Sequence, residues 1–395
     1  MTIRKALYPL LLVFAFLTFL ISPAYILFGI LSLLWMADVG RSHRWSEVLR
    51  GPMTLCLGLQ ALFLILSTAL SRNPAASAQH LAGVSLFLLL PIAVDLFDRP
   101  ERARSVLLAV AANGLLLSAI GVWQFAHGGN DLENRITGPL SHYMTFSGLT
   151  MIGGCVLLGL ALEGRGAWRW VGVLAVVPLG AMLLTFTRNA YVGILIAVVV
   201  YLALRRPRGL LWLVPALVLV FVLSPPAIRA RIRSIPSLKD ITNRDRISMI
   251  HAGARMIADD PFFGIGPEMV RAQYPLYRDP DAAQWRVPHL HDNAMQLAAA
   301  SGLPEAAAYL AMMAVFFVRT VRLIARERRP AQSALLAGAF LAGAALFCAG
   351  FFEYNWGDTE VEMATLLVLA VPFSRAAAPT AINRADGLAN GGDPS

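Results

Sequence analysis

The sequence predicts an all-α, polytopic integral membrane protein with about twelve transmembrane helices and one large loop that contains short helices. Two features of the composition support this fold class: 57% of the 395 residues are hydrophobic and 14% are charged, whereas soluble domains carry about 25% charged residues. Apolar runs long enough to cross a hydrocarbon layer of about 30 Å also recur along the whole chain. We therefore expect a membrane protein rather than a soluble globular one.

The apolar runs are separated by short polar turns. The predicted spans are Ala6–Ile21, Pro23–Met36, Gly51–Leu70, Leu81–Phe97, Ser105–Ala126, His142–Leu162, Trp170–Phe186, Ala190–Leu204, Leu210–Ser224, Pro304–Val321, Gln332–Phe352 and Val361–Phe373. The first two runs are divided by Ser22 and Pro23, and they can form one long helix or two short ones. The N-terminus resembles a signal peptide but has no small-residue cleavage site, so we expect it to be retained as a span.

The distribution of basic residues predicts the orientation of the spans. Most of the 33 Lys and Arg residues cluster in alternate turns, which the positive-inside bias assigns to the cytoplasm. The chain then divides into nine spans (1–224), an outer loop (225–303), three further spans (304–374) and a disordered cytoplasmic tail (375–395), rich in Ala, Gly, Asn and Pro.

The net charge of +9 does not indicate nucleic-acid binding, because most of the basic residues lie in the short turns between spans. The outer loop is the exception, since its many arginines call for an acidic partner. The cysteines Cys56, Cys155 and Cys348 each lie inside an apolar run without a CxxC pair, so we expect buried thiols and neither a disulfide framework nor a cysteine metal site.

Two short helices are predicted within the outer loop. Arg246–Ala258 places apolar side chains at helical spacing, and Asp259–Pro261 ends the pattern. His291–Ala300 is the second predicted helix, and Gly302 and Pro304 separate it from the next span.

Arginines on the outer side are the first candidates for chemistry. Arg188 lies in a very tight turn between two spans, and a lone arginine there is commonly a membrane-interface residue. Because the outer side is the wrong one for that role, we interpret Arg188 as a ligand of a phosphate or diphosphate, which a guanidinium binds with two parallel hydrogen bonds. Arg135 is a second outer arginine, for which a solvated loop charge and an anion contact are equally supported.

Arg244 and Arg246 lie at the start of the first loop helix. Arg244 can pair with Asp240 or Asp245, whereas Arg246 opens the amphipathic face and can reach back to the membrane surface.

The pair His289 and His291 can point the same way on an extended segment. Two histidines can bind a metal, but no further ligand follows at a recognisable spacing, so we predict no metal site. A general base that deprotonates a hydroxyl is the preferred interpretation, with the choice between the two histidines open and helix capping as the structural alternative.

An acidic turn holds Glu353, Asp358 and Glu360 beside Tyr354 and Trp356. Carboxylates next to aromatic rings suit sugar hydroxyls. Salt bridges with the inner loop or a solvated turn are the alternatives, and we interpret Glu353 as a sugar or arginine contact.

Three segments together resemble the O-antigen ligase and polymerase superfamily. The first holds Arg246, Ile250, Pro261, Gly264, Gly266 and Pro267 at their spacing, the second is His291–Gln296 followed by Gly302, and the third is the Thr187–Arg188 turn. The sequence departs from the superfamily pattern at Ile250, Asp292 and Glu305, where Trp, Asn and Gly are usual.

This resemblance implies transfer of a glycan from undecaprenyl diphosphate to an acceptor hydroxyl, with inversion and without a cofactor, metal or nucleotide sugar. It implies that His291 is the base and that Arg188 and Arg246 neutralise the leaving diphosphate. The residues expected to contact substrate are Arg135, His289, Asn293, Arg244 and Glu353.

The expected partners are the carrier-linked donor, a lipid A–core or glycan acceptor, and membrane lipids. The expected location is the bacterial inner membrane, with multiple spans and a periplasmic active site. A ligase is preferred to a repeat-unit polymerase that uses the same donor. A transporter or flippase for an anionic lipid is the alternative from another class.

Overall fold

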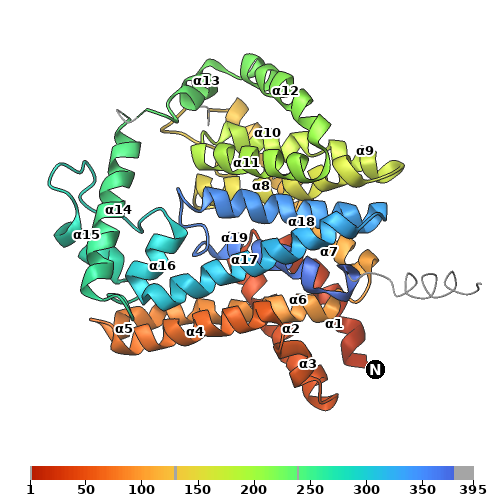
Figure 1. Ribbon diagram of the computed structural model, residues 1–395, viewed down its shortest axis with the longest axis horizontal. Helices are drawn as coiled ribbons and strands as arrows, with labels where there is room; N and C mark the ends of the chain where they lie inside the picture. Colours follow the sequence, from red (N-terminus) through yellow and green to blue (C-terminus); the bar gives the residue numbers. More distant parts are fainter. Residues whose placement is uncertain (1, 129–130, 238–239, 378–395) are drawn as a thin grey trace, which may run out of the picture.

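The computed structural model describes residues 2–128, 131–237 and 240–377, and this part of the chain is helical without any strand (Figure 1). The predicted all-α fold of a polytopic membrane protein is confirmed. Nine segments are long and apolar enough to cross a membrane among these residues: Ile21–Arg41 (α2), Pro52–Leu70 (α4), Pro74–Leu96 (α5, η1 and α6), Pro100–Ala126 (α7), Tyr143–Glu163 (α8), Ala167–Leu184 (α9 and α10), Arg188–Arg205 (α11), Leu303–Arg326 (α17) and Pro330–Ala349 (α18).

The count of twelve full-length spans is not confirmed. The other three predicted spans form shorter helices: α1 (Thr2–Leu17, 16 residues), α12 (Leu210–Leu223, 14 residues) and α19 (Thr359–Ala370, 12 residues). At 1.5 Å per residue, helices of this length are too short to cross about 30 Å of hydrocarbon unaided. Apolar composition alone does not distinguish them from full spans.

The first two helices separate before the predicted break. α1 ends at Leu17 and α2 begins at Ile21, so Ser22 and Pro23 lie in the first turn of α2. Proline is tolerated there because the first-turn N–H groups have no partner inside the helix. The chain therefore forms two helices rather than one.

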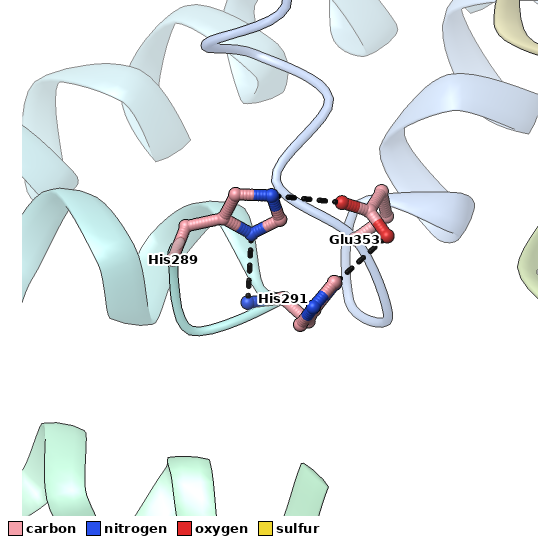
Figure 2. Close-up of side chains that lie close together, drawn as sticks. All are labelled: His289, His291 and Glu353. Carbon is pink, nitrogen blue, oxygen red and sulfur yellow. Dashed lines mark hydrogen bonds and ion pairs between the residues drawn. The ribbon is translucent and has the colours of Figure 1, made fainter. Parts of the chain in front are cut away.

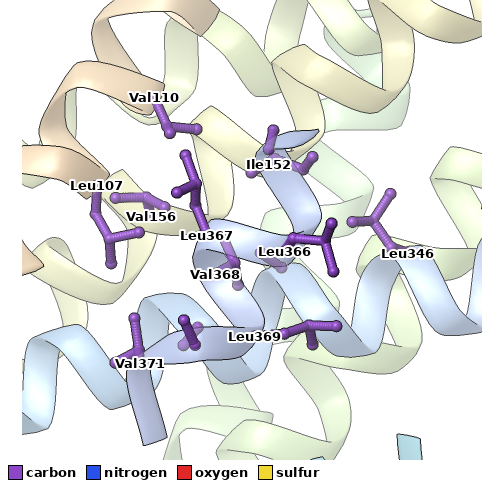
Figure 3. Close-up of a cluster of buried hydrophobic side chains, with 14 of the residues drawn as sticks. Leu107, Val110, Ile152, Val156, Leu346, Leu366, Leu367, Val368, Leu369 and Val371 are labelled. Atoms are coloured by element: carbon purple, nitrogen blue, oxygen red, sulfur yellow. The ribbon is translucent and has the colours of Figure 1, made fainter. Parts of the chain in front are cut away.

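The centre of the molecule is built from α7, α8, α18 and α19, whose apolar side chains interlock (Figure 3). Small residues allow these helices to approach closely, as is common in membrane proteins. A Cβ added at Gly159 of α8 would lie 2.4 Å from the backbone nitrogen of Gly338 in α18. α19 lies inside this packing, and its apolar residues are buried.

Residues between α12 and α17 form four helices beside the bundle: α13 (Pro226–Arg233), α14 (Ile241–Asp259), α15 (Met269–Tyr277) and α16 (Asn293–Ser301) (Figure 1). α14, α15 and α16 share a small apolar core, which includes Met256, Tyr274 and Leu290.

The two predicted loop helices are confirmed as α14 and α16 with shifted starts. α14 begins earlier because the Asp240 carboxylate accepts hydrogen bonds from the backbone N–H groups of Thr242 and Asn243.

At the C-terminus, Arg375–Ala377 form a short 3₁₀ turn, and the backbone N–H of Ala376 donates to Phe97 O at 3.0 Å. These residues belong to the segment predicted as a disordered tail. The rest of that segment, 378–395, lies outside the described residues.

Candidate functional site

A cavity of about 750 Å³ opens where the starts of α8 and α19 meet α16 and the 3₁₀ helix η1 (Ala78–Leu88). His289, His291 and Glu353 line it. The two histidines precede α16, and Glu353 lies in the turn between α18 and α19. The cavity thus lies between the outer loop and the acidic turn, two segments that the sequence indicated independently of each other.

The Glu353 carboxylate lies between two imidazole rings (Figure 2). Its Oε2 is 2.9 Å from Nδ1 of His291, and its Oε1 is 3.4 Å from Nε2 of His289. The Glu353 side chain is 7% exposed. Both carboxylate oxygens therefore face histidines, and the expected contact of Glu353 with a sugar stays a prediction.

Hydrogen bonds distinguish the two histidines. The backbone N–H of His291 donates to Nδ1 of His289 at 3.3 Å, so that nitrogen carries no proton. The proton of the neutral ring is then on Nε2, which lies 3.4 Å from Oε1 of Glu353. His291 uses Nδ1 toward Glu353, and its Nε2 has no hydrogen-bond partner among the described residues. With the proton held on Nδ1, the Nε2 lone pair of His291 is free to accept another.

The backbone positions His291 outside the helix. Asp292 caps α16 by accepting a hydrogen bond from the N–H of Met295 at 2.8 Å, so the predicted start at His291 is wrong by two residues. His291 itself has φ of 53°, in the left-handed region that costs a residue with a Cβ about 1 kcal/mol or more. Backbone strain of this kind clusters at functional sites.

Electrostatics favour an ionised Glu353 beside a neutral His289. Burial alone would raise the pKa of Glu353, but the hydrogen bond from His291 and the positive charge of Arg246 help to bring it below its ordinary value. Burial also lowers the pKa of His289 to about 4, against the attraction of Glu353. The neutral ring of His289 agrees with the hydrogen-bond pattern.

Arg246 lies close enough to Glu353 for their charges to interact, although it is not among the residues that line the cavity. Burial, and then the charge of Arg188, lower the pKa of Arg246, while Glu353 raises it. Its Nε is buried without a hydrogen-bond partner within the described part of the chain. A buried guanidinium nitrogen left unpaired is costly, and an anionic ligand would satisfy it.

Arg188, by contrast, has its terminal nitrogens occupied. Nη1 donates to the backbone oxygen and the hydroxyl of Ser234, and Nη2 donates to Asp240 at 3.1 Å and to Asn243 at 3.0 Å. The side chain is 5% exposed. In this structure Arg188 ties α13 and α14 to the start of α11 and adds positive charge behind Arg246.

Two further arginines complete a basic group of four with Arg188 and Arg246. Arg135 lies with its guanidinium 4.3 Å from the centre of the Tyr143 ring. Burial, followed by the charges of Arg188 and Arg135, lowers the pKa of Arg231 to about 10. The sequence analysis did not single out Arg231. Its signal was the run of alternating arginines in α13, whose direction depends on where that helix docks.

Two predicted substrate contacts lie elsewhere. Asn293 is buried, donates to Tyr309 at 3.0 Å and to Asn355 at 2.8 Å, and accepts from the N–H of Trp356. It therefore joins α16 to the acidic turn. Arg244 is exposed and forms a surface ion pair with Asp281 at 3.5 Å rather than with Asp240 or Asp245.

The start of α8 contributes cavity residues that the sequence analysis missed. His142 and Tyr143 line the cavity, as does Thr145, whose hydroxyl donates to Asp358. Burial lowers the pKa of His142, against the attraction of Glu353 and Asp358. Nothing in the sequence near α8 marks these residues, because their partners are distant in the chain: Thr145 and Asp358 are 213 positions apart.

The triad of His289, His291 and Glu353 also has the composition of a metal site. One ligand atom from each residue lies within 4.8 Å of the other two. The same geometry thus suits either a proton relay or a divalent cation.

Comparison with known proteins identifies a family for part of the chain. No curated protein matches the chain. The sequence model of the family described as O-Antigen ligase matches residues 173–310, a segment that includes Arg188, Arg246 and both histidines. This match, over about a third of the chain, supports the resemblance to the O-antigen ligase superfamily, an O-antigen ligase or polymerase type of membrane enzyme.

Proposed function

We propose that the protein transfers an O-antigen glycan from undecaprenyl diphosphate to a sugar hydroxyl of lipid A–core at the periplasmic face of the inner membrane. The observation that carries this proposal is the pairing of His291 Nδ1 with Glu353 beside four arginines. Sugar transfer from a diphosphate needs a base that deprotonates the acceptor hydroxyl and positive groups that stabilise the leaving diphosphate. This arrangement offers both.

The arginines bind the donor diphosphate. Arg246 contacts it through its unpaired guanidinium edge, and Arg135, Arg188 and Arg231 add positive potential. As the bond between the anomeric carbon and the diphosphate oxygen breaks, its electron pair moves onto the diphosphate. Fixed positive charges stabilise that developing charge in a partly dry site, where electrostatic interactions are strong.

His291 activates the acceptor. Its Nε2 removes the proton of a sugar hydroxyl while the oxygen attacks the anomeric carbon from the side opposite the diphosphate, which inverts that centre. Glu353 keeps the other ring proton on Nδ1 and stabilises the imidazolium that forms. The proton then leaves His291 to solvent. No metal or cofactor takes part in these steps.

Replacing His291 tests the base. In His291→Ala, we expect transfer of glycan to lipid A–core to fall at least about 100-fold, with donor binding unchanged, because general-base catalysis contributes about 10²–10⁴-fold. Glu353→Gln should also lower transfer with little effect on donor binding, since an amide does not hold the productive tautomer. His127→Ala, an exposed histidine outside the cavity, is the control. Near wild-type transfer by His291→Ala would show that the base is a different group.

The same experiment separates an enzyme from a transporter or flippase. A carrier for anionic lipid would use the arginines to bind its cargo and would keep its activity in His291→Ala. Transfer by the purified enzyme in EDTA addresses the metal interpretation of the triad. Persistence of activity is the expected result, and loss that Mg²⁺ or Zn²⁺ restores would assign the triad to a metal.

A repeat-unit polymerase is the second candidate, because the superfamily includes both reactions. Deleting the gene distinguishes them when lipopolysaccharide is resolved on a gel. Long glycans left on the carrier indicate a ligase, whereas single repeats on lipid A–core indicate a polymerase.

A further inference from the structure

A second cavity, of about 290 Å³, lies where α8, α11 and α18 end or begin. Its charged and hydroxyl lining residues are Glu163, Arg165, Arg169, Arg205, Arg206, Arg328 and Ser333. None of these belongs to the candidate functional site.

The two cavities lie at opposite ends of the same helices. α8 begins at the candidate site with Tyr143 and ends at Glu163, and α11 begins with Arg188 and ends at Arg205. The 21 residues of α8 span about 30 Å, the thickness of a hydrocarbon layer. The second cavity therefore lies at the membrane face opposite the candidate site.

Positive charge in this cavity is far from balanced. Arg205 and Arg206 share the Glu163 carboxylate, at 3.8 and 3.1 Å. The side chains of Arg165, Arg169 and Arg328 have no hydrogen bond or ion pair within the described residues. The one carboxylate in the described lining, Glu163, is thus shared by Arg205 and Arg206, and the other three guanidinium groups have no anion of their own.

A buried, unsatisfied hydroxyl points to a ligand independently of the charges. Ser333 is 6% exposed and lines the cavity, and its Oγ has no hydrogen-bond partner in the described chain. It lies in the first turn of α18, which begins at Pro330. The start of a 20-residue helix carries partial positive charge and adds to the attraction for an anion.

We propose that this cavity binds a phosphate group, held by Arg165, Arg169 and Arg328 and by the hydroxyl of Ser333. The favoured source is the headgroup of an anionic phospholipid. Trp168 and Trp170 flank Arg169 in the sequence of α9 (Ala167–Val173) and are exposed, Trp170 at 75%. Exposed tryptophans at the end of a span are typical of headgroup depth. Basic pockets between transmembrane helices are suited to anionic headgroups.

Binding of short-chain phosphatidylglycerol to the purified protein in neutral detergent tests the proposal, with phosphatidylcholine of the same chain length as the reference. Native mass spectrometry counts the bound lipid, and the rise in Tm gives an apparent affinity. Phosphatidylglycerol should bind the wild type at least about tenfold more tightly than phosphatidylcholine. Equal binding of the two lipids would overturn the proposal.

Variants locate the site. In Arg165→Gln/Arg169→Gln/Arg328→Gln, phosphatidylglycerol should bind about 10- to 100-fold more weakly. Ser333→Ala keeps the net charge and should bind about tenfold more weakly, because it lacks one hydrogen bond to a charged group. The matched control Arg41→Gln/Arg322→Gln/Arg326→Gln removes three exposed arginines outside the cavity and should bind normally. If this control variant lost as much binding as the cavity variant, the effect would be one of net charge alone, and the proposed site would be wrong.

Inorganic phosphate distinguishes the source of the ligand. If millimolar inorganic phosphate displaces bound phosphatidylglycerol less effectively than free phosphatidylglycerol does, the result supports a site for a lipid headgroup. If inorganic phosphate raises the Tm with the same dependence on the three arginines, and phosphatidylglycerol does not, the site stands as one for a free phosphate. These measurements use binding alone, so they do not depend on the proposed transferase activity.

Discussion

Arg244 and Arg246 are two residues apart on α14, but they differ in burial and in hydrogen-bond partners. Arg246 lies near Glu353 and Arg188, with its Nε buried and unpaired in the described structure. Arg244 is exposed and pairs with Asp281, which is also exposed, in an interaction worth at most about 1 kcal/mol. The same substitution at the two positions therefore separates an effect on the candidate site from an effect of lost surface charge.

Arg246→Gln should weaken binding of an undecaprenyl diphosphate donor about 10- to 100-fold, because a charge-assisted contact with the diphosphate is lost. Arg246→Lys should recover part of the affinity, since an ammonium keeps the charge without the planar fork. Donor binding by scintillation proximity or native mass spectrometry gives the affinities. Arg244→Gln is the matched control, and an equal loss there would remove Arg246 from the site.

His289 makes the loop sensitive to acid. Its imidazole titrates near pH 6.5 in an unfolded chain and near pH 4 in the folded protein, chiefly because it is buried. Between these values the unfolded state binds the extra proton. Stability that is present above pH 6.5 is therefore lost as the pH falls toward 4, by roughly 3 kcal/mol at most.

The free energy of unfolding of His289→Gln should consequently fall less between pH 7 and pH 4.5 than that of the wild type. The glutamine is neutral throughout this range. Thermal unfolding in detergent at the two pH values checks this, with His127→Gln expected to behave as wild type. An identical acid response in wild type and His289→Gln would show that His289 is not the buried titrating group.

At the scale of the element, Asp240 links the start of α14 to the bundle. Its carboxylate caps the helix through Thr242 and Asn243 and accepts a hydrogen bond from Arg188. Burial alone would raise the pKa of Asp240, but Arg188 and Arg231 bring it below its usual range. One side chain thus serves as helix cap and as tether for the segment that carries Arg246.

Asp240→Ala should expose the first turns of α14 to hydrogen exchange, because the cap is worth about 1 kcal/mol and the tether is lost with it. Asp240→Asn keeps a capping oxygen and loses the charge, so its exchange should be intermediate. Hydrogen-exchange mass spectrometry follows peptides from α14, with α4 as the internal reference. Wild-type exchange in Asp240→Ala would mean that packing alone holds the helix.

For the whole molecule, close helix packing depends on small residues. The α8–α18 contact leaves no space at Gly159, where an added Cβ would meet the backbone of Gly338. At Gly58 of α4, nothing lies within 4 Å of the added atom. The two glycines lie in comparable apolar helices but face a neighbouring backbone and open space, respectively.

Gly159→Ala should lower the free energy of unfolding by about 1–3 kcal/mol, because α8 and α18 must move apart. Gly58→Ala should leave it unchanged or raise it by up to about 1 kcal/mol, since alanine restricts the unfolded chain. Unfolding monitored by circular dichroism in detergent compares the pair. Similar stabilities would contradict the close α8–α18 contact.

The amino-acid sequence by itself determined the helical class, the positions of most spans and two of the helices beside the bundle. Backbone groups in hydrocarbon must bond within their own segment, so a long apolar run predicts a helix without knowledge of its neighbours. The sequence also identified His289, His291 and Glu353 as candidates. Their residue types suggested a base and a carboxylate.

Only the tertiary structure decided how these residues combine. His291 and Glu353 are 62 positions apart and meet because Asn293 joins α16 to the turn after α18. Arg188 is bound by its own loop whereas Arg246 keeps an unpaired nitrogen, a difference that depends on where α13 and α14 dock. Helix formation is a local property of the chain, but the partners of a polar side chain are set by packing between distant segments.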